Sequence, residues 1–163
     1  MMTPAEHGVL INEMRLRPPV EILARTIWGE ARGEGKDTRD PVDDFIAMLS
    51  VGQVILNRAK IGGWWGGNVP GVCLNPGQFS CWLRADPNLS KLRDVTSADP
   101  EYAMAYGVAS ILLRYYPAKL NDLTNGATHY YAKWLPQPPV WWAKMQQVAA
   151  VGRHLFGKEI KTA

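Results

Sequence analysis

Apolar residues recur at steps of three and four along three stretches of the chain, and this rhythm constrains the fold more than any other feature. In the first stretch, residues 20–34, the stripe consists of Val20, Leu23, Ile27 and Ala31. Similar stripes run through residues 45–60 and 103–115. Such spacing gives a helix one apolar face, which must be buried against other elements. We therefore expect three helices around one core.

The starts of these helices carry recognisable signals. Asp40-Pro41 and Asp99-Pro100 each place an N-cap residue before a proline at the first helical position. Pro18 and Pro19 stand at the start of the first stripe, where a missing backbone N–H is tolerated. Gly52 lies on the apolar face of the second helix, where its lack of a side chain should let another helix approach closely.

The remaining segments predict a long loop and a small sheet. Residues 61–93 are rich in Gly, Pro, Asn and Trp without periodicity, which favours a structured, functional loop. Residues 127–132 and 151–156 are β-prone and are joined by a connection rich in Pro and Trp. We expect an α+β fold, mainly helical with a small antiparallel sheet near the C-terminus. At 163 residues, the chain (1–163) is expected to form a single domain.

Charge and composition narrow the class of partner. A net charge of +3 is too weak for a nucleic-acid binder but suits an anionic polymer. Residues 1–19 hold no apolar run of signal-peptide length, and no later stretch is long enough to span a bilayer. We expect synthesis in the cytoplasm without a signal peptide, no nucleic-acid partner and no stable membrane insertion. The 7 Trp and 6 Tyr serve either a core or a binding groove.

The cysteines and histidines show no metal-binding pattern. Cys73 and Cys81 flank a turn-forming stretch, so they are either a local disulfide or two free thiols packed close together. The three histidines, His7, His129 and His154, lack the close spacing of a metal site. We therefore predict no metal and no cofactor.

Two carboxylates lie at the edge of the first apolar stripe. At 100° per residue, Glu30 and Glu34 lean toward the stripe, whereas Glu21, Arg25 and Arg32 cluster on the opposite, polar face. A carboxyl group against apolar surface has its charged form disfavoured, which is how a glycosidase keeps a proton for a leaving oxygen near neutral pH. The alternative is that either glutamate accepts hydrogen bonds from loop backbone and stabilises the fold.

Five blocks in order resemble the SleB/CwlJ-type cell wall hydrolases of spore germination and phage lysis cassettes. They reach across most of residues 20–157 and read LARTIWGEARGE (23–34), VGQVILNR (51–58), GVCLNPGQFSCW (71–82), GATHYY (126–131) and VGRHLF (151–156). The resemblance implies a lysozyme-like fold, with Glu30 as the catalytic acid. It also implies cleavage between N-acetylmuramic acid and N-acetylglucosamine, and a role for Glu34 in ordering the site.

Family members are often lytic transglycosylases, in which one acid protonates the leaving oxygen and the muramic acid's own hydroxyl closes an anhydro ring. This route needs no second carboxylate. Asp86 and Asp122, in loops near family blocks, are better interpreted as turn residues. Hydrolysis by water, as in a muramidase, stays open. The chain departs from the family pattern at residues 35–45, a longer charged link, and at Tyr131, which leaves His129 as the better polar candidate.

Several further residues are candidates for contacting substrate. The long loop offers amide, hydroxyl and ring groups of the kinds that orient acetamido sugars, namely Gln78, Phe79, Ser80 and Trp82. His129 and Tyr130 extend this set. Asn57 either reaches Glu30 or substrate, or is a cap or a satisfied core amide. In the pairs Trp64-Trp65 and Trp141-Trp142, adjacent rings point to different faces, so at most one ring of each pair is expected to stack on a sugar.

Two rival classes of function remain. A non-catalytic peptidoglycan-binding module would keep the fold without the activity. An amidase or peptidase would need a zinc set or a Cys-His nucleophile, and neither is visible in the sequence. The favoured hypothesis is a monomeric, endolysin-like enzyme that acts on peptidoglycan glycan strands in the periplasm or outside the cell.

Overall fold

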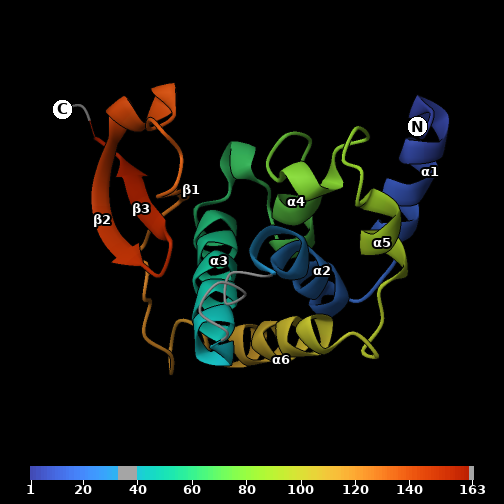
Figure 1. Ribbon diagram of the computed structural model, residues 1–163, viewed down its shortest axis with the longest axis horizontal. Helices are drawn as coiled ribbons and strands as arrows, with labels where there is room; N and C mark the ends of the chain where they lie inside the picture. Colours follow the sequence, from blue (N-terminus) through green and yellow to red (C-terminus); the bar gives the residue numbers. More distant parts are fainter. Residues whose placement is uncertain (33–39, 162–163) are drawn as a thin grey trace.

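The computed structural model describes residues 1–32 and 40–161. Figure 1 shows a helical body on one side and a small sheet on the other, with the two termini at opposite ends. The elements are α1 (Pro4–Arg15), α2 (Pro19–Ala31), α3 (Pro41–Ile61), η1 (Gly63–Trp65), α4 (Val69–Leu74), η2 (Ser80–Trp82), α5 (Leu89–Asp94), α6 (Pro100–Tyr115), β1 (His129–Ala132), η3 (Val140–Lys144), β2 (Met145–Val151) and β3 (His154–Glu159).

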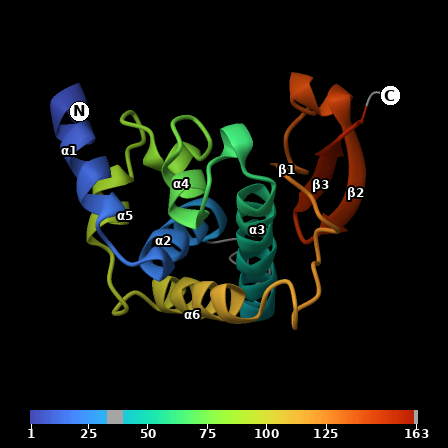
Figure 2. The same ribbon diagram turned by 180° about the vertical axis from the view of Figure 1, so that it is seen from behind.

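The three helices predicted from periodicity are α2, α3 and α6, and they build the main core. The helix α6 runs across the base of α2 and α3 in both views (Figures 1 and 2). Asp40 and Asp99 cap α3 and α6 through their side chains, as expected. A Cβ at Gly52 would collide with Leu112 of α6 and Ile27 of α2, so the close helix approach predicted at this glycine is confirmed.

The helices α1, α4 and α5 were not predicted from the sequence. The helix α1 begins at a capping box in which Thr3 and Glu6 satisfy each other's backbone N–H groups. It buries only Leu10 and Met14, so its apolar stripe is too thin to stand out from the sequence. The loop expected at residues 61–93 contains α4 and α5, each six residues long, together with η1 and η2. Within the departure noted at residues 35–45, residues 35–39 lie outside the described part of the chain, and residues 40–45 are the N-cap and the first residues of α3.

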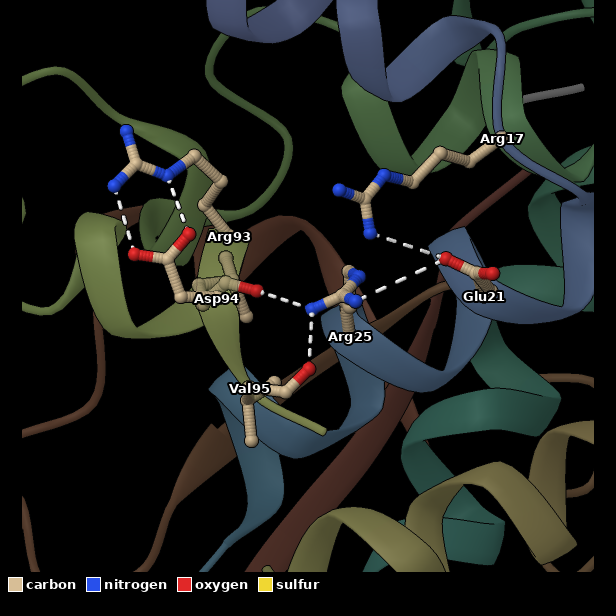
Figure 3. Close-up of polar contacts among 7 residues, drawn as sticks. Arg17, Glu21, Arg25, Arg93, Asp94 and Val95 are labelled. Carbon is tan, nitrogen blue, oxygen red and sulfur yellow. Dashed lines mark hydrogen bonds and ion pairs between the residues drawn. The ribbon is translucent and has the colours of Figure 1, made fainter. Parts of the chain in front are cut away.

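The prediction that Arg25 lies on the polar face of the first predicted helix, away from the core, is wrong. Its side chain is buried, and Nη1 donates to the carbonyl oxygens of Leu92 at 2.7 Å and Val95 at 3.1 Å (Figure 3). Nη2 lies 3.8 Å from Glu21, which also pairs with Arg17. Burial lowers the pKa of Arg25, although a guanidinium stays charged at neutral pH. Arg25 therefore ties α2 to the end of α5.

The predicted antiparallel sheet is present and has three strands in the order β1-β3-β2. Tyr130 of β1 pairs with Phe156 of β3. The segment 151–156, expected as one strand, is instead the end of β2, a turn at Gly152 with φ of +54°, and the start of β3. The strand β2 was predicted as connection, and a register shift between Gln147 and Ala149 interrupts its pairing with β3.

A second, smaller core joins the sheet to the helical body. It consists of Val54 of α3, Ala127 and Phe156, with Tyr130 packed against them. Because α3 contributes to both cores, it fixes the sheet relative to α2 (Figure 2). Within the described residues, no helix has both the length and the apolar character needed to cross a membrane.

Candidate active site

A cleft of about 510 Å³ lies where the long loop and η1 face the sheet and η3. It gathers one carboxylate, one guanidinium, two further polar side chains of the loop, and aromatic rings from four segments. The lining residues are Glu30, Arg58, Trp64, Trp65, Pro76, Gly77, Gln78, Phe79, Ser80, His129, Tyr130 and Trp141. Six of the residues predicted from sequence meet here: Glu30, Gln78, Phe79, Ser80, His129 and Tyr130.

Glu30 reaches the cleft from the last turn of α2 and is half-buried. Its two oxygens have different partners from distant parts of the chain. Oε2 accepts from the Tyr130 hydroxyl at 3.0 Å, and Oε1 accepts from the backbone N–H of Cys81 at 3.4 Å. Burial first, and then the negative charge of Glu30, raises the pKa of Tyr130, so its hydroxyl keeps the proton that it donates. The carboxyl group is thus held in one place while still facing open space.

Gly29 explains how the Cys81 backbone comes so close to Glu30. A Cβ at Gly29 would lie 2.7 Å from the Cys81 Cβ and 2.9 Å from its Sγ. The missing side chain therefore lets η2 pack directly on the end of α2. The glycine before the acid is part of the site's geometry, because any larger residue would push Cys81 away.

Arg58 is the main feature of the cleft that the sequence reasoning missed. It is 7% exposed, and its Nε donates to the Thr128 carbonyl at 2.8 Å while Nη1 donates to Gln78 Oε1 at 3.0 Å. Burial lowers the pKa of Arg58, and the charge of Glu30 acts in the opposite direction. The available signal was its place on the apolar face of α3, four residues after Val54, where a cation is unusual.

The loop residues share the cleft unequally. Gln78 is half-buried and engaged with Arg58, whereas Ser80 is exposed at the start of η2. Phe79 is almost fully buried, and its ring centroid lies 5.0 Å from the Arg58 guanidinium carbon. Gly77, with φ of +78°, makes the turn that presents Gln78 to the cleft. The loop thus offers polar groups at the surface and an apolar support beneath them.

His129 connects the polar and aromatic parts of the cleft. Its Nδ1 lies 2.9 Å from the Thr128 hydroxyl, and its ring lies 5.2 Å from Trp65 and 5.4 Å from Trp141, between centroids. Burial, followed by the positive charge of Arg58, lowers the pKa of His129. Its imidazole is therefore neutral at physiological pH.

One ring of each adjacent tryptophan pair is presented to solvent in the cleft. Trp64 is 70% exposed and stacks on the buried Trp65, with centroids 4.5 Å apart and an interplanar angle of 18°. Trp141 is 39% exposed, whereas Trp142 packs against Tyr131, and a Cβ at Gly157 would contact its ring. Trp65 and Trp142 therefore support the exposed rings.

Asn57 lies outside the cleft. It is 8% exposed, and its Nδ2 donates to Asp122 Oδ2 at 3.1 Å and to the Ala127 carbonyl at 3.0 Å, while Oδ1 accepts from the Tyr116 hydroxyl. Asp122 also accepts from Thr124, and these bonds lower its pKa although burial opposes them. Asn57 is therefore a core amide whose hydrogen bonds are made within the protein, which is one of the alternatives from the sequence, and it does not face the substrate cleft.

Trp82, also predicted as a substrate contact, does not line the cleft. It is 5% exposed, and its Nε1 donates to the Thr26 hydroxyl at 2.9 Å inside the core. The His7 ring of α1 lies 2.8 Å from the backbone carbonyl oxygen of Trp82. Glu34, the second predicted acid, lies outside the described residues.

Cys73 and Cys81 are free, buried thiols, one of the two alternatives left open by the sequence. Burial raises the pKa of Cys73 to about 12. Burial, and then the charge of Glu30, also raises the pKa of Cys81 well above its usual value. Neither thiol has the ionised character of a cysteine nucleophile. Among the residues that the structure describes, no three His, Cys, Asp or Glu side chains are grouped as a metal site.

Fold and cleft together define a lysozyme-like α+β protein with one carboxylate among the described residues of an open, aromatic groove. A family model described as cell wall hydrolase matches residues 43–157, well over half of the chain. The chain therefore belongs to the cell wall hydrolase family. The matched residues begin downstream of Glu30.

Two solved structures share the fold. The catalytic domain of the Bacillus cereus SleB protein gives a TM-score of 0.58 at 20% identity, covering 86% of this chain and 89% of that one. The catalytic domain of the germination-specific lytic transglycosylase SleB from Bacillus anthracis gives 0.57 at 21% identity, covering 86% and 93%. A comparison with curated proteins gave no match.

Proposed function

We propose that this chain degrades peptidoglycan by cleaving its glycan strands between N-acetylmuramic acid and N-acetylglucosamine, with Glu30 as the acid. One observation carries the proposal: a half-buried carboxyl group, fixed by Tyr130 and by the Cys81 backbone, faces an open cleft lined with exposed aromatic rings. Membership of the cell wall hydrolase family agrees with this substrate. We further propose that residues 1–163 act as a single catalytic domain and a monomer.

The chemistry asks Glu30 to give its proton to the leaving glycosidic oxygen. Once the proton has left, the carboxylate is stabilised by the two hydrogen bonds that it accepts from Tyr130 and Cys81. Because these donors belong to the folded chain, the charge is met by groups already in position, with little reorganisation. A nearby sugar hydroxyl or a water molecule then forms a bond to the sugar carbon as the bond to the leaving oxygen breaks. The Glu30 carboxylate takes up the proton that the attacking oxygen loses and is again an acid.

The cleft favours the anhydro-forming route over a double-displacement route. A retaining glycosidase needs a second carboxylate about 5 to 5.5 Å from the first. Among the described residues that line the cleft, Glu30 is the sole carboxylate, and Asp122 is directed to Thr124 and Asn57 instead. In the lytic transglycosylase route the muramic acid's own hydroxyl takes the place of that second group.

A non-catalytic wall-binding module is the second candidate, and the exposed rings of Trp64 and Trp141 favour it as much as they favour an enzyme. The two candidates differ in what they release from the wall. We also propose a role in host cell lysis, because the sequence blocks resemble a family that is found in phage lysis cassettes as well as in spore germination. That role predicts lysis of an expressing host only when its inner membrane is also opened.

The proposal is tested with purified peptidoglycan and the purified chain. The account expects the suspension to clear and soluble sugar-containing fragments to accumulate at a rate proportional to protein concentration. A chain that co-sediments with the wall and releases no fragments would support the binding module and reject the enzyme. Heat-denatured protein provides the control for non-specific clumping of the walls.

A further inference from the structure

Arg58 is held on four sides, which fixes the orientation of its neighbour Gln78. Its guanidinium carbon lies 4.3 Å from the ring centroid of Trp65 and 5.0 Å from that of Phe79. In its own plane it donates to the Thr128 carbonyl and to Gln78 Oε1. A planar guanidinium held by two rings and two acceptors has little freedom to turn.

The chemistry of arginine decides which way the Gln78 amide points. A guanidinium has donors and no acceptor, so the amide atom that faces Arg58 at 3.0 Å must be the oxygen. The Gln78 NH₂ group, with two donors, is consequently turned away from Arg58. Gln78 is half-buried and lines the cleft, and within residues 1–32 and 40–161 no hydrogen bond from its Nε2 is found. The cleft therefore presents two oriented N–H donors.

We infer that Gln78 recognises the carbonyl oxygen of an acetamido group on a wall sugar, with Arg58 as the positioning residue, so that the cleft discriminates against de-N-acetylated peptidoglycan. This inference rests on the proposed function and specifies its substrate. An acetamido carbonyl is an acceptor of the right kind for the two donors of Gln78. Removing the acetyl group leaves an ammonium, which offers donors alone.

Two effects act together against the ammonium. It cannot pair with the Gln78 NH₂ group, because both are donors, and that group is then left without its partner. The positive charge of Arg58, directly behind the amide, also repels it. Glu30 lines the same cleft and its carboxylate attracts an ammonium, so the measured preference is what remains after this attraction. A lost neutral hydrogen bond corresponds to about 2- to 10-fold in rate, and the repulsion adds to this.

The experiment uses one preparation of walls in three forms: N-acetylated, de-N-acetylated, and de-N-acetylated then chemically re-acetylated. The unmodified chain should release fragments about tenfold faster from the first form than from the second, and re-acetylation should restore the rate. Equal rates on all three forms would overturn the inference while leaving the proposed function intact. No release from any form would reject the proposed function, and the inference with it.

The variant Gln78→Glu tests the donor itself. It keeps the size of the side chain and an acceptor for Arg58, but it replaces the two donors with a carboxylate oxygen. We expect the rate on N-acetylated walls to fall about tenfold and the preference between wall forms to vanish or reverse. Because the preference is a ratio measured on one protein sample, partial unfolding does not affect it. An unchanged preference in Gln78→Glu would overturn the inference.

Two further variants separate charge from position. Gln147→Glu makes the same change of net charge at an exposed residue of β2 that does not line the cleft, and it should keep the full preference. Arg58→Lys keeps the positive charge but loses the fork that bonds Thr128 and Gln78 together, so the preference should shrink even though the charge remains. A full preference in Arg58→Lys would contradict the positioning role.

Discussion

The acid side and the aromatic side of the cleft are built in different ways. On the acid side, Glu30 is half-buried and each carboxyl oxygen meets a donor from a distant segment, Tyr130 or Cys81. On the aromatic side, Trp64 and Trp141 expose broad ring faces whose support is other rings. Proton transfer requires atoms fixed within tenths of an ångström, whereas a ring face tolerates small shifts of a sugar.

This difference predicts how each side responds to change. Alterations on the acid side should affect the chemical step and be sensitive to the geometry of single atoms. Alterations on the aromatic side should weaken substrate binding in smaller steps.

Glu30→Gln should cause the largest loss. The amide keeps the size and shape of the side chain but cannot deliver a proton, and acid catalysis is worth about 10²- to 10⁴-fold in rate. We expect kcat to fall by that order while the circular dichroism spectrum and Tm stay close to those of the unmodified chain. The exposed Glu13→Gln is the matched control, and Glu34→Gln should lose less than Glu30→Gln. A near-normal kcat in folded Glu30→Gln would show that Glu30 is not the catalytic acid.

Acid should destabilise the sheet behind Tyr130. His154 lies 5.4 Å from the Tyr130 ring, and burial, with Arg153 and Lys133 adding to it, lowers its pKa to about 4 from 6.5. Between these two values the unfolded chain binds more protons than the folded one. The free energy of unfolding therefore falls as the pH drops from 6.5 to 4, by about 3 kcal/mol in all.

Urea titrations at pH 7 and pH 4.5 measure this loss. His154→Gln should show a smaller difference between the two pH values, because the residue no longer titrates. The lowered pKa of His129 adds a change of the same sign in both proteins and does not affect the comparison. Equal pH dependence in the two proteins would show that His154 is not the source.

Tyr130→Phe should remove one of the two donors to Glu30 without removing the ring. Hydrogen bonds to charged groups contribute about 1.5 to 3 kcal/mol, so kcat should fall about 10- to 100-fold with KM little changed. Tyr131→Phe is the matched control, because that side chain contacts Trp141 and Trp142 instead of Glu30. A rise in KM with unchanged kcat would show that Tyr130 contributes to substrate binding and not to the chemical step.

Trp64→Ala should have the smallest effect, and the effect should be on KM instead of kcat. Loss of one stacking face is worth about 0.5 to 1.5 kcal/mol, which corresponds to a rise in KM of about 2- to 10-fold with kcat nearly unchanged. Trp134→Ala, which removes an exposed ring next to Arg153, should leave KM unaltered. A drop in kcat equal to that of Tyr130→Phe would break the contrast between the two sides.

Periodicity in the sequence predicted those helices in which buried apolar residues recur along one face. The helices α2, α3 and α6 have continuous apolar stripes and were predicted close to their ends. The strand β2 was missed because exposed Gln146 and Gln147 and the register shift after them break the alternation that marks a strand. The sequence did not reveal the burial of Arg25, because its partners, the carbonyls of Leu92 and Val95, lie about 70 residues away in the sequence.

The family-like sequence blocks contain the residues that were predicted for the site and also Arg58, which was missed because its partners lie far away in the sequence. Glu30 and Gln78 stand in sequence blocks that resemble a family, and both line the cleft. Arg58 and Asn57 are adjacent on α3, yet one faces the cleft and the other the core. Their different roles are set by Gln78, Thr128, Asp122 and Ala127, and no local pattern in the sequence encodes these pairings.

Mass spectrometry of the fragments released from purified walls tests the central claim most directly. The account predicts muropeptides with intact peptide stems, cut between N-acetylmuramic acid and N-acetylglucosamine, and absent when Glu30→Gln replaces the unmodified chain. Ends about 18 Da lighter than the reducing-end product would identify the anhydro-forming route over hydrolysis. Fragments cut only in the peptide stems, or the same glycan fragments released by Glu30→Gln, would contradict the account.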